Sequence, residues 1–138
     1  MKVVIDTSVL VAASRSRNGA SFALINELPS ARIQPCLSVG LYCEWQSVMC
    51  RAENIPAGLT TDDVLGYLRY IASQSHLQDI NFLWRPFLKD PDDDMILELA
   101  FAAKCPYILT HNVKDFSGSE KFGIKAITPA DFLRRLEK

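Results

Sequence analysis

The sequence predicts one α/β domain, a three-layer α/β/α sandwich built around a mostly parallel sheet. Its 138 residues fit a single hydrophobic core, because domains of about 100–150 residues are the commonest size, so we expect one domain over residues 1–138. The apolar share of 49% and the charged share of 22% are typical of a globular chain. Short β-branched runs alternate with segments of helical periodicity, and this alternation indicates parallel strands joined by helices.

The first half of the chain contains two of the expected strands. Val3, Val4 and Ile5 form a β-branched run that is typical of a buried strand. Ser38 is an N-cap type of residue and predicts the start of a helix. The elements expected here are, in order, a strand at 3–5, a helix capped at 6–8, a short helix at 22–28 stopped by Pro29, a strand at 33–37 and a helix from Ser38 to about Arg51.

The second half adds helices whose starts are marked by capping residues. Asp90 followed by Pro91, and Thr128 followed by Pro129, each place an N-cap before a proline at the first helical position. The elements expected here are, in order, a helix opening at Thr60 or Thr61, a strand or extended edge at 80–84, a helix at 90–103, strands at 107–110 and 124–127, and a terminal helix at 128–136.

Charge and cysteine content exclude several classes of protein. The net charge of −1 argues against binding of nucleic acid through overall positive charge, so any such contact must be local or carried by metal. Four cysteines without C-x-x-C spacing are expected to be reduced and mostly buried. No apolar run approaches the ~20 residues of a membrane span, so we expect a soluble, cytoplasmic protein that does not contact the membrane.

Acidic side chains follow two of the predicted strands and crowd one helix start. Asp6 comes directly after the first strand, while Asn112 and Asp115 follow the strand at 107–110. In parallel sheets, functional groups gather at the carboxyl ends of the strands. Asp6 alone has a simpler interpretation as a helix cap.

The helix start at 90–94 carries four aspartates: Asp90, Asp92, Asp93 and Asp94. Acids at a helix N-terminus interact favourably with the helix dipole, but four exceed that need, and crowded carboxylates raise each other's pKa or recruit cations. An oxygen-rich set favours Mg²⁺ or Mn²⁺ over zinc. Glu44 lies within an apolar stretch, where it either points to solvent or serves a site.

Four segments together resemble the motifs of the PIN-domain family. The start at 4–10 is similar to the family's hydrophobic run followed by Asp, Thr and Asn or Ser, and Ser38 followed by Glu44 resembles its second motif. Residues 90–100 resemble the third motif and residues 110–116 the fourth. The ending at 127–133 is similar to that of VapC-like ribonucleases, the toxins of toxin–antitoxin pairs.

The resemblance implies a site and an activity. The metal ligands would be Asp6, Glu44, Asp93 and Asp115, which would also be the catalytic residues, with Asp94 as the alternative to Asp93. One of this neighbouring pair should face the site and the other solvent. The activity would be Mg²⁺- or Mn²⁺-dependent hydrolysis of RNA, with an antitoxin protein as partner. The residues expected to support the ligands or contact substrate are Thr7, Ser8, Thr110 and Asn112.

The sequence is also compatible with two functions other than a metal-dependent ribonuclease. A phosphatase of the haloacid dehalogenase kind also has an aspartate after its first strand, but it needs a second aspartate where this chain has Ser8. A catalytically silent PIN-like binding domain is the other, because many relatives carry an aspartate at the position of Asn112. We also expect a homodimer, since the apolar helices at 41–49 and 64–71 offer more hydrophobic surface than one core needs.

Overall fold

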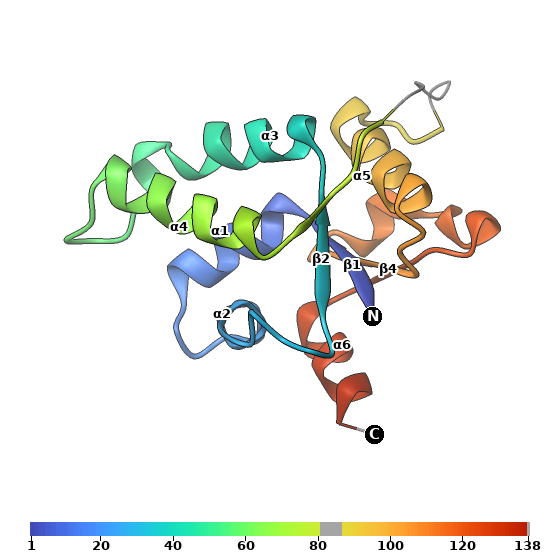
Figure 1. Cartoon of the computed structure of the whole chain (residues 1–138), viewed down its shortest axis with the longest axis horizontal. Helices are drawn as coiled ribbons and strands as arrows, with labels where there is room; N and C mark the ends of the chain where they lie inside the picture. Colours follow the sequence, from blue (N-terminus) through green and yellow to red (C-terminus); the bar gives the residue numbers. More distant parts are fainter. Residues whose placement is uncertain (81–86, 138) are drawn as a thin grey trace.

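A computed structural model describes residues 1–80 and 87–137, which form a five-stranded sheet with helices around it (Figure 1). The strands are β1 (Lys2–Ile5), β2 (Gln34–Leu37), β3 (His76–Leu77), β4 (Tyr107–Leu109) and β5 (Lys125–Ile127). The α-helices are α1 (Thr7–Arg15), α2 (Ala20–Asn26), α3 (Val39–Met49), α4 (Thr61–Ser73), α5 (Pro91–Ala102) and α6 (Pro129–Leu136). The 3₁₀ helices are η1 (Ala52–Asn54), η2 (Val113–Phe116) and η3 (Ser119–Phe122).

The strand order is β3-β2-β1-β4-β5, and every neighbouring pair is parallel. From β1 the chain moves to β2 and β3 on one side, then returns to β4 and β5 on the other. Right-handed crossovers that run in opposite directions place their helices on opposite faces of a sheet. Figure 1 accordingly shows α5 on one side of the strands and α1, α3 and α4 on the other. The predicted α/β fold with a parallel sheet is confirmed.

The core is continuous through the central strand. Val3, Val4 and Ile5 have no exposed surface, as expected for a parallel strand covered on both faces. Trp45 of α3 is also fully buried, and its indole Nε1 donates a hydrogen bond to the Ile5 carbonyl at 3.3 Å. This tryptophan therefore packs in the core and offers no platform for stacking a base.

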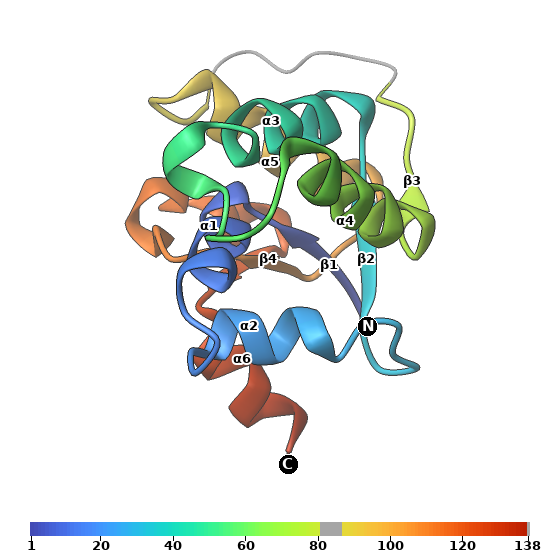
Figure 2. The ribbon, with the colours of Figure 1, turned by 90° about the vertical axis from the view of Figure 1, so that its left-hand side faces the viewer.

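The helix starts follow their capping residues closely. Four of the predicted caps accept a hydrogen bond from a backbone N–H in the first turn of their helices, namely Ser38 from Leu41, Thr60 from Asp63, Asp90 from Asp92 and Thr128 from Asp131. Figure 2 shows α2 and α6 together in the lower part of the view, and α3 and α5 in its upper part. The first turn of α3 lies close to α5, because a Cβ added to Gly40 would lie 2.8 Å from Met95 Sδ.

Two features differ from the sequence prediction, and a third prediction falls mostly on residues that the structure does not describe. Strand β3 was not predicted, because its two exposed residues carry no periodic signal. The strand expected at 80–84 lies outside the described residues except for Ile80, which belongs to no strand. All four cysteines are free thiols, but only Cys36 and Cys105 are buried, while Cys43 is exposed. Over the ranges that the structure covers, the helices are too short or too polar to cross a membrane.

Candidate metal centre

The candidate site lies where the chain reverses its direction of travel across the sheet. Asp6 follows β1 and Thr110 follows β4, and these neighbouring strands lead to connections on opposite sides of the sheet. The backbone N–H of Asp6 donates to the Leu109 carbonyl at 2.9 Å, which continues the ladder to the edge. Ligands of α/β proteins bind in the crevice outside such a reversal point.

The Asp6 carboxylate is held by hydroxyl groups. Ser8 Oγ donates to Oδ2 at 2.8 Å and Thr110 Oγ1 donates to the same oxygen at 2.7 Å. Asp6 occupies the N-cap position of α1, yet its side chain makes no capping hydrogen bond. The simpler interpretation of Asp6 as a helix cap is therefore wrong. Both hydrogen bonds found among the described residues end on Oδ2, so Oδ1 stays available to a ligand.

Glu44 points toward the same edge from the middle of α3. Its Oε2 accepts a hydrogen bond from Thr7 Oγ1 at 2.6 Å, which fixes the carboxylate beside the start of α1. Burial raises the pKa of Glu44, and the negative charges of Asp92 and Asp6 raise it further. Glu44 is therefore half-buried near other acids and does not simply point to solvent.

Asp93 lies among the other candidate acids at the start of α5. The pKa of Asp93 is raised to about 7, first by burial and then by the charges of neighbouring carboxylates. Those carboxylates are, in order of effect, Asp90, Asp6, Asp115 and Glu44. The structure thus brings all four of the proposed ligands into one electrostatic environment.

Asp94 was expected to face solvent if its neighbour Asp93 faces the site, and this expectation is wrong. Only 8% of Asp94 is exposed. Its Oδ1 accepts a hydrogen bond from the backbone N–H of Leu88 at 2.8 Å. Both carboxylate oxygens also lie 3.3 Å from the backbone nitrogen of Phe87, which donates to them. The carboxylate therefore fixes the segment that enters α5.

The fourth motif contributes an exposed acid and a backbone contact. Asp115 lies in η2 and is exposed, and its charge reaches Asp93. Asn112 is also exposed, and its backbone N–H donates to Thr110 Oγ1 at 2.9 Å. The main chain of Asn112 therefore supports the Thr110 hydroxyl that donates to Asp6.

Two acids outside the predicted ligand set, Asp90 and Asp92, also lie beside the site. The negative charge of Asp92 raises the pKa of Glu44, and Asp90 exerts the largest charge effect on the pKa of Asp93. The acids of α3 and α5 meet because these helices pack closely, since a Cβ added to Gly40 would lie 2.8 Å from Met95 Sδ. Gly40, in the first turn of α3, was the sequence feature that could have indicated this close packing.

Arg15 and Arg17 lie at and just beyond the carboxyl end of α1, away from Asp6 at its start. Arg15 is the last residue of α1, and its guanidinium donates to Asn54 Oδ1 at 2.9 Å. Arg17 lines a cavity of about 370 Å³ between α1, α2 and α4. Lys114, in contrast, is exposed next to Asp115 in η2. Phosphate contacts at the acidic edge therefore cannot come from Arg15 or Arg17 in this arrangement.

The donor set at this edge fits a hard divalent cation. Its side chains offer oxygen atoms only, and such ligands suit Mg²⁺ and Mn²⁺. The ion pairs formed by the described residues, Arg32 with Glu27 and Arg134 with Asp131, involve none of these acids. Within the same residues no three acids, histidines or cysteines already converge at ligand distances. Closure around a cation therefore requires small side-chain movements, for which the exposed Asp115 and half-buried Asp93 have room.

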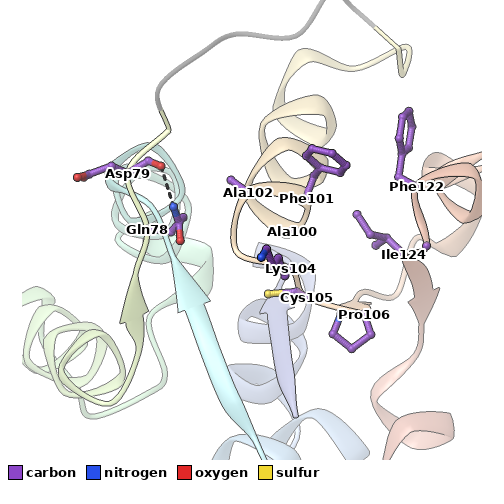
Figure 3. A pocket seen from close by; sticks show the side chains of 11 residues that line it. Gln78, Asp79, Ala100, Phe101, Ala102, Lys104, Cys105, Pro106, Phe122 and Ile124 are labelled. Carbon is purple, nitrogen blue, oxygen red and sulfur yellow. Dashed lines mark hydrogen bonds between the residues drawn. The ribbon is translucent and has the colours of Figure 1, made fainter.

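A cavity of about 630 Å³ lies away from these acids (Figure 3). It is lined by the carboxyl end of α5 around Phe101 and Cys105 and by residues before β5, including Ile124. The aspartates occupy the opposite end of α5, and a helix of this length extends roughly 18 Å. This apolar cavity is thus separate from the candidate metal centre.

Comparison with known proteins identifies similar sequences and folds. Residues 2–114 match the family model of the PIN domain. No curated protein matches. The solved structure of VapBC-1 from nontypeable Haemophilus influenzae is similar with a TM-score of 0.62 and 15% identity, over 94% of this chain and 99% of that chain. VapBC2 from Rickettsia felis, bound to a DNA fragment from their promoter, has a TM-score of 0.62 and 14% identity, over 93% and 98%. At such identities the likeness concerns the fold.

Proposed function

Because this chain belongs to the PIN-domain family, we propose that it is a metal-dependent endoribonuclease that hydrolyses phosphodiester bonds of RNA. The observation that carries the proposal is the gathering of acids from the end of β1 and from α3, α5 and η2 at one edge of the sheet, where the charges of Asp6, Glu44 and Asp115 act on Asp93. Uncompensated carboxylates of this kind are destabilising unless a cation or protons neutralise them. A nuclease that works through divalent cations accounts for this arrangement.

In the proposed site, Asp6, Glu44, Asp93 and Asp115 hold Mg²⁺ or Mn²⁺. The cation would supply activation of a water molecule and stabilisation of negative charge on the phosphate and the leaving oxygen. The carboxylates orient the cation and do not attack the substrate. Thr7 holds Glu44, while Ser8 and Thr110 hold Asp6, so that each ligand keeps one direction. Asn112, exposed at the mouth of the site, is available to the substrate.

The geometry speaks against a phosphatase of the haloacid dehalogenase kind. Such an enzyme uses an acid two positions after the first aspartate. Here that position is Ser8, whose hydroxyl donates its hydrogen to Asp6. The side chain supports the first aspartate and cannot act as the second acid.

The test is cleavage of labelled single-stranded RNA with Mg²⁺, Mn²⁺ or EDTA, for the wild type and Asp6→Asn. Asp62→Asn is the matched control, since Asp62 is an exposed acid in the first turn of α4, away from the site. We expect cleavage with either metal, none with EDTA or in Asp6→Asn, and full activity in the control. Metal-independent cleavage would reject the mechanism. Metal binding without cleavage of any RNA would favour the silent binding domain.

We further propose that the protein is the toxin of a toxin–antitoxin pair and forms a homodimer. The support is the fold shared with the two VapBC structures and the similarity of the ending at 127–133 to such toxins. Coexpression with the product of the gene directly upstream should give a stable complex in which RNA cleavage is inhibited. Independent purification of the two products, with cleavage unchanged on mixing, would reject the pairing.

A further inference from the structure

A buried serine on α2 contacts the loop that carries the site. Ser21 is 3% exposed, and its Oγ lies 2.6 Å from Nε2 of His111, which is 90 residues away in the sequence. His111 follows Thr110 directly at the carboxyl end of β4. The contact therefore joins α2, which supplies none of the acids, to the segment between Thr110 and Asp115.

His111 is fixed at a second point by its main chain. Its backbone N–H donates to Ser8 Oγ at 3.1 Å. A serine hydroxyl has one hydrogen and two acceptor positions. Because His111 occupies an acceptor position, the single hydrogen of Ser8 remains directed at Asp6 Oδ2, 2.8 Å away.

Ser8 has an alternative partner if this arrangement relaxes. Thr110 Oγ1 lies 3.4 Å from Ser8 Oγ, and it already donates to Asp6. A shift of His111 would free Ser8 Oγ to rotate toward Thr110, and Asp6 would lose one of its two hydroxyl donors. Asp6 Oδ1 would then no longer be presented in a single direction.

We propose that Ser21 and His111 are positioning residues: their hydrogen bond fixes the loop after β4, which keeps Ser8 directed at Asp6 and so sets the affinity of the site for its cation. The inference rests on the proposed function, because it takes Asp6 to be a metal ligand. It assigns Ser21 and His111 no contact with the cation or with RNA.

The experiment measures Mn²⁺ affinity by calorimetry and by the electron paramagnetic resonance signal of free Mn²⁺. The variants are Ser21→Ala, His111→Ala, the double variant and His111→Gln, whose amide nitrogen can replace Nε2. Ser73→Ala and His76→Ala are matched controls, because both residues are exposed and distant in sequence from the acids. Circular dichroism melting of each variant reports its folding.

Each single alanine variant should weaken Mn²⁺ binding by about 3- to 10-fold, less than the 10–100-fold typical when a direct partner of a ligand is lost. The double variant should bind like His111→Ala alone, because both changes break one interaction. His111→Gln should recover most of the affinity, and the controls should match the wild type. Equal loss in Ser21→Ala and His111→Gln with lowered melting temperatures would indicate a structural role and overturn the proposal.

Two further outcomes would also overturn it, and they differ from failure of the proposed function. Wild-type Mn²⁺ affinity in the alanine variants, with a raised KM for RNA, would make His111 a substrate contact. Wild-type affinity with unchanged KM would leave the contact without effect on the site. If the wild type itself binds no Mn²⁺, the proposed function fails, and this inference fails with it.

Discussion

Replacing Asp93 and Asp94 one at a time by asparagine should change stability in opposite directions. Asp94 accepts hydrogen bonds from the backbone N–H groups of Phe87 and Leu88 and is 8% exposed. Hydrogen bonds to a charged group contribute about 1.5–3 kcal/mol. Asparagine keeps one acceptor oxygen and turns a donor toward a donor. We therefore expect Asp94→Asn to lower the melting temperature by roughly 5–12 °C for a chain of this size.

Asp93→Asn should instead stabilise the metal-free protein at pH 8. At that pH the Asp93 carboxyl, with its pKa raised to about 7, is mostly ionised while surrounded by other negative charges. The neutral amide removes this repulsion. Because the side chain is only half-buried, solvent screening reduces the gain, so we expect a small rise in melting temperature.

Function should change in the reverse order. Asp93→Asn should abolish metal-dependent RNA cleavage and weaken Mn²⁺ binding, whereas Asp94→Asn should keep substantial activity at temperatures well below its melting point. Thermal melts in EDTA and in Mn²⁺, together with cleavage assays, decide the matter. Loss of activity only in a folded Asp94→Asn, or destabilisation by Asp93→Asn equal to that by Asp94→Asn, would refute the assignment.

Three further predictions concern the cation, the pH dependence and the assembly. Mg²⁺ or Mn²⁺ should raise the melting temperature of the wild type and much less that of Asp6→Asn; stabilisation by zinc alone would contradict an oxygen-only site. In EDTA, stability toward urea should fall as pH rises from roughly 4 to 7, because the pKa of Asp93 in the folded protein, about 7, exceeds the 3.8 of an aspartate in the unfolded chain, so the folded state binds more protons in that window; an unchanged slope in Asp93→Asn would contradict this. Light scattering should give a dimer, and a monomer throughout the micromolar range would exclude it.

The structure removes the argument on which the dimer prediction was based. It relied on apolar residues of α3 and α4 beyond the needs of one core. In the structure Leu41, Trp45 and Met49 of α3, and Val64, Leu68 and Ile71 of α4, are all buried within the single chain. A dimer formed through these helices would therefore use other residues, such as Val39, which is 80% exposed.

Sequence patterns located the ends of most elements because those ends depend on residues close in sequence. Ser38 and Thr128 cap helices through contacts three positions away, so their effect is visible in a short window. Strand β3 has only two exposed residues and gains its place by pairing with β2. Likewise, the contact between Ser21 and His111 spans 90 residues. Neither has a local signature that a pattern of periodicity could detect.

The aspartates of α5 show why composition alone could not define the site. Their number suggested a surplus of negative charge, but the structure divides the four among different tasks. Asp90 caps the helix, and Asp94 holds Phe87 and Leu88, so both have structural work independent of a cation. Asp92 lies against Glu44, and Asp93 lies within reach of the charge of Asp6. One helix position rotates a side chain by about 100°, so Asp93 and Asp94 point in different directions. The local motif thus narrows the proposed metal ligand to these two neighbours, and the hydrogen bonds of Asp94 to the backbone of Phe87 and Leu88 favour Asp93.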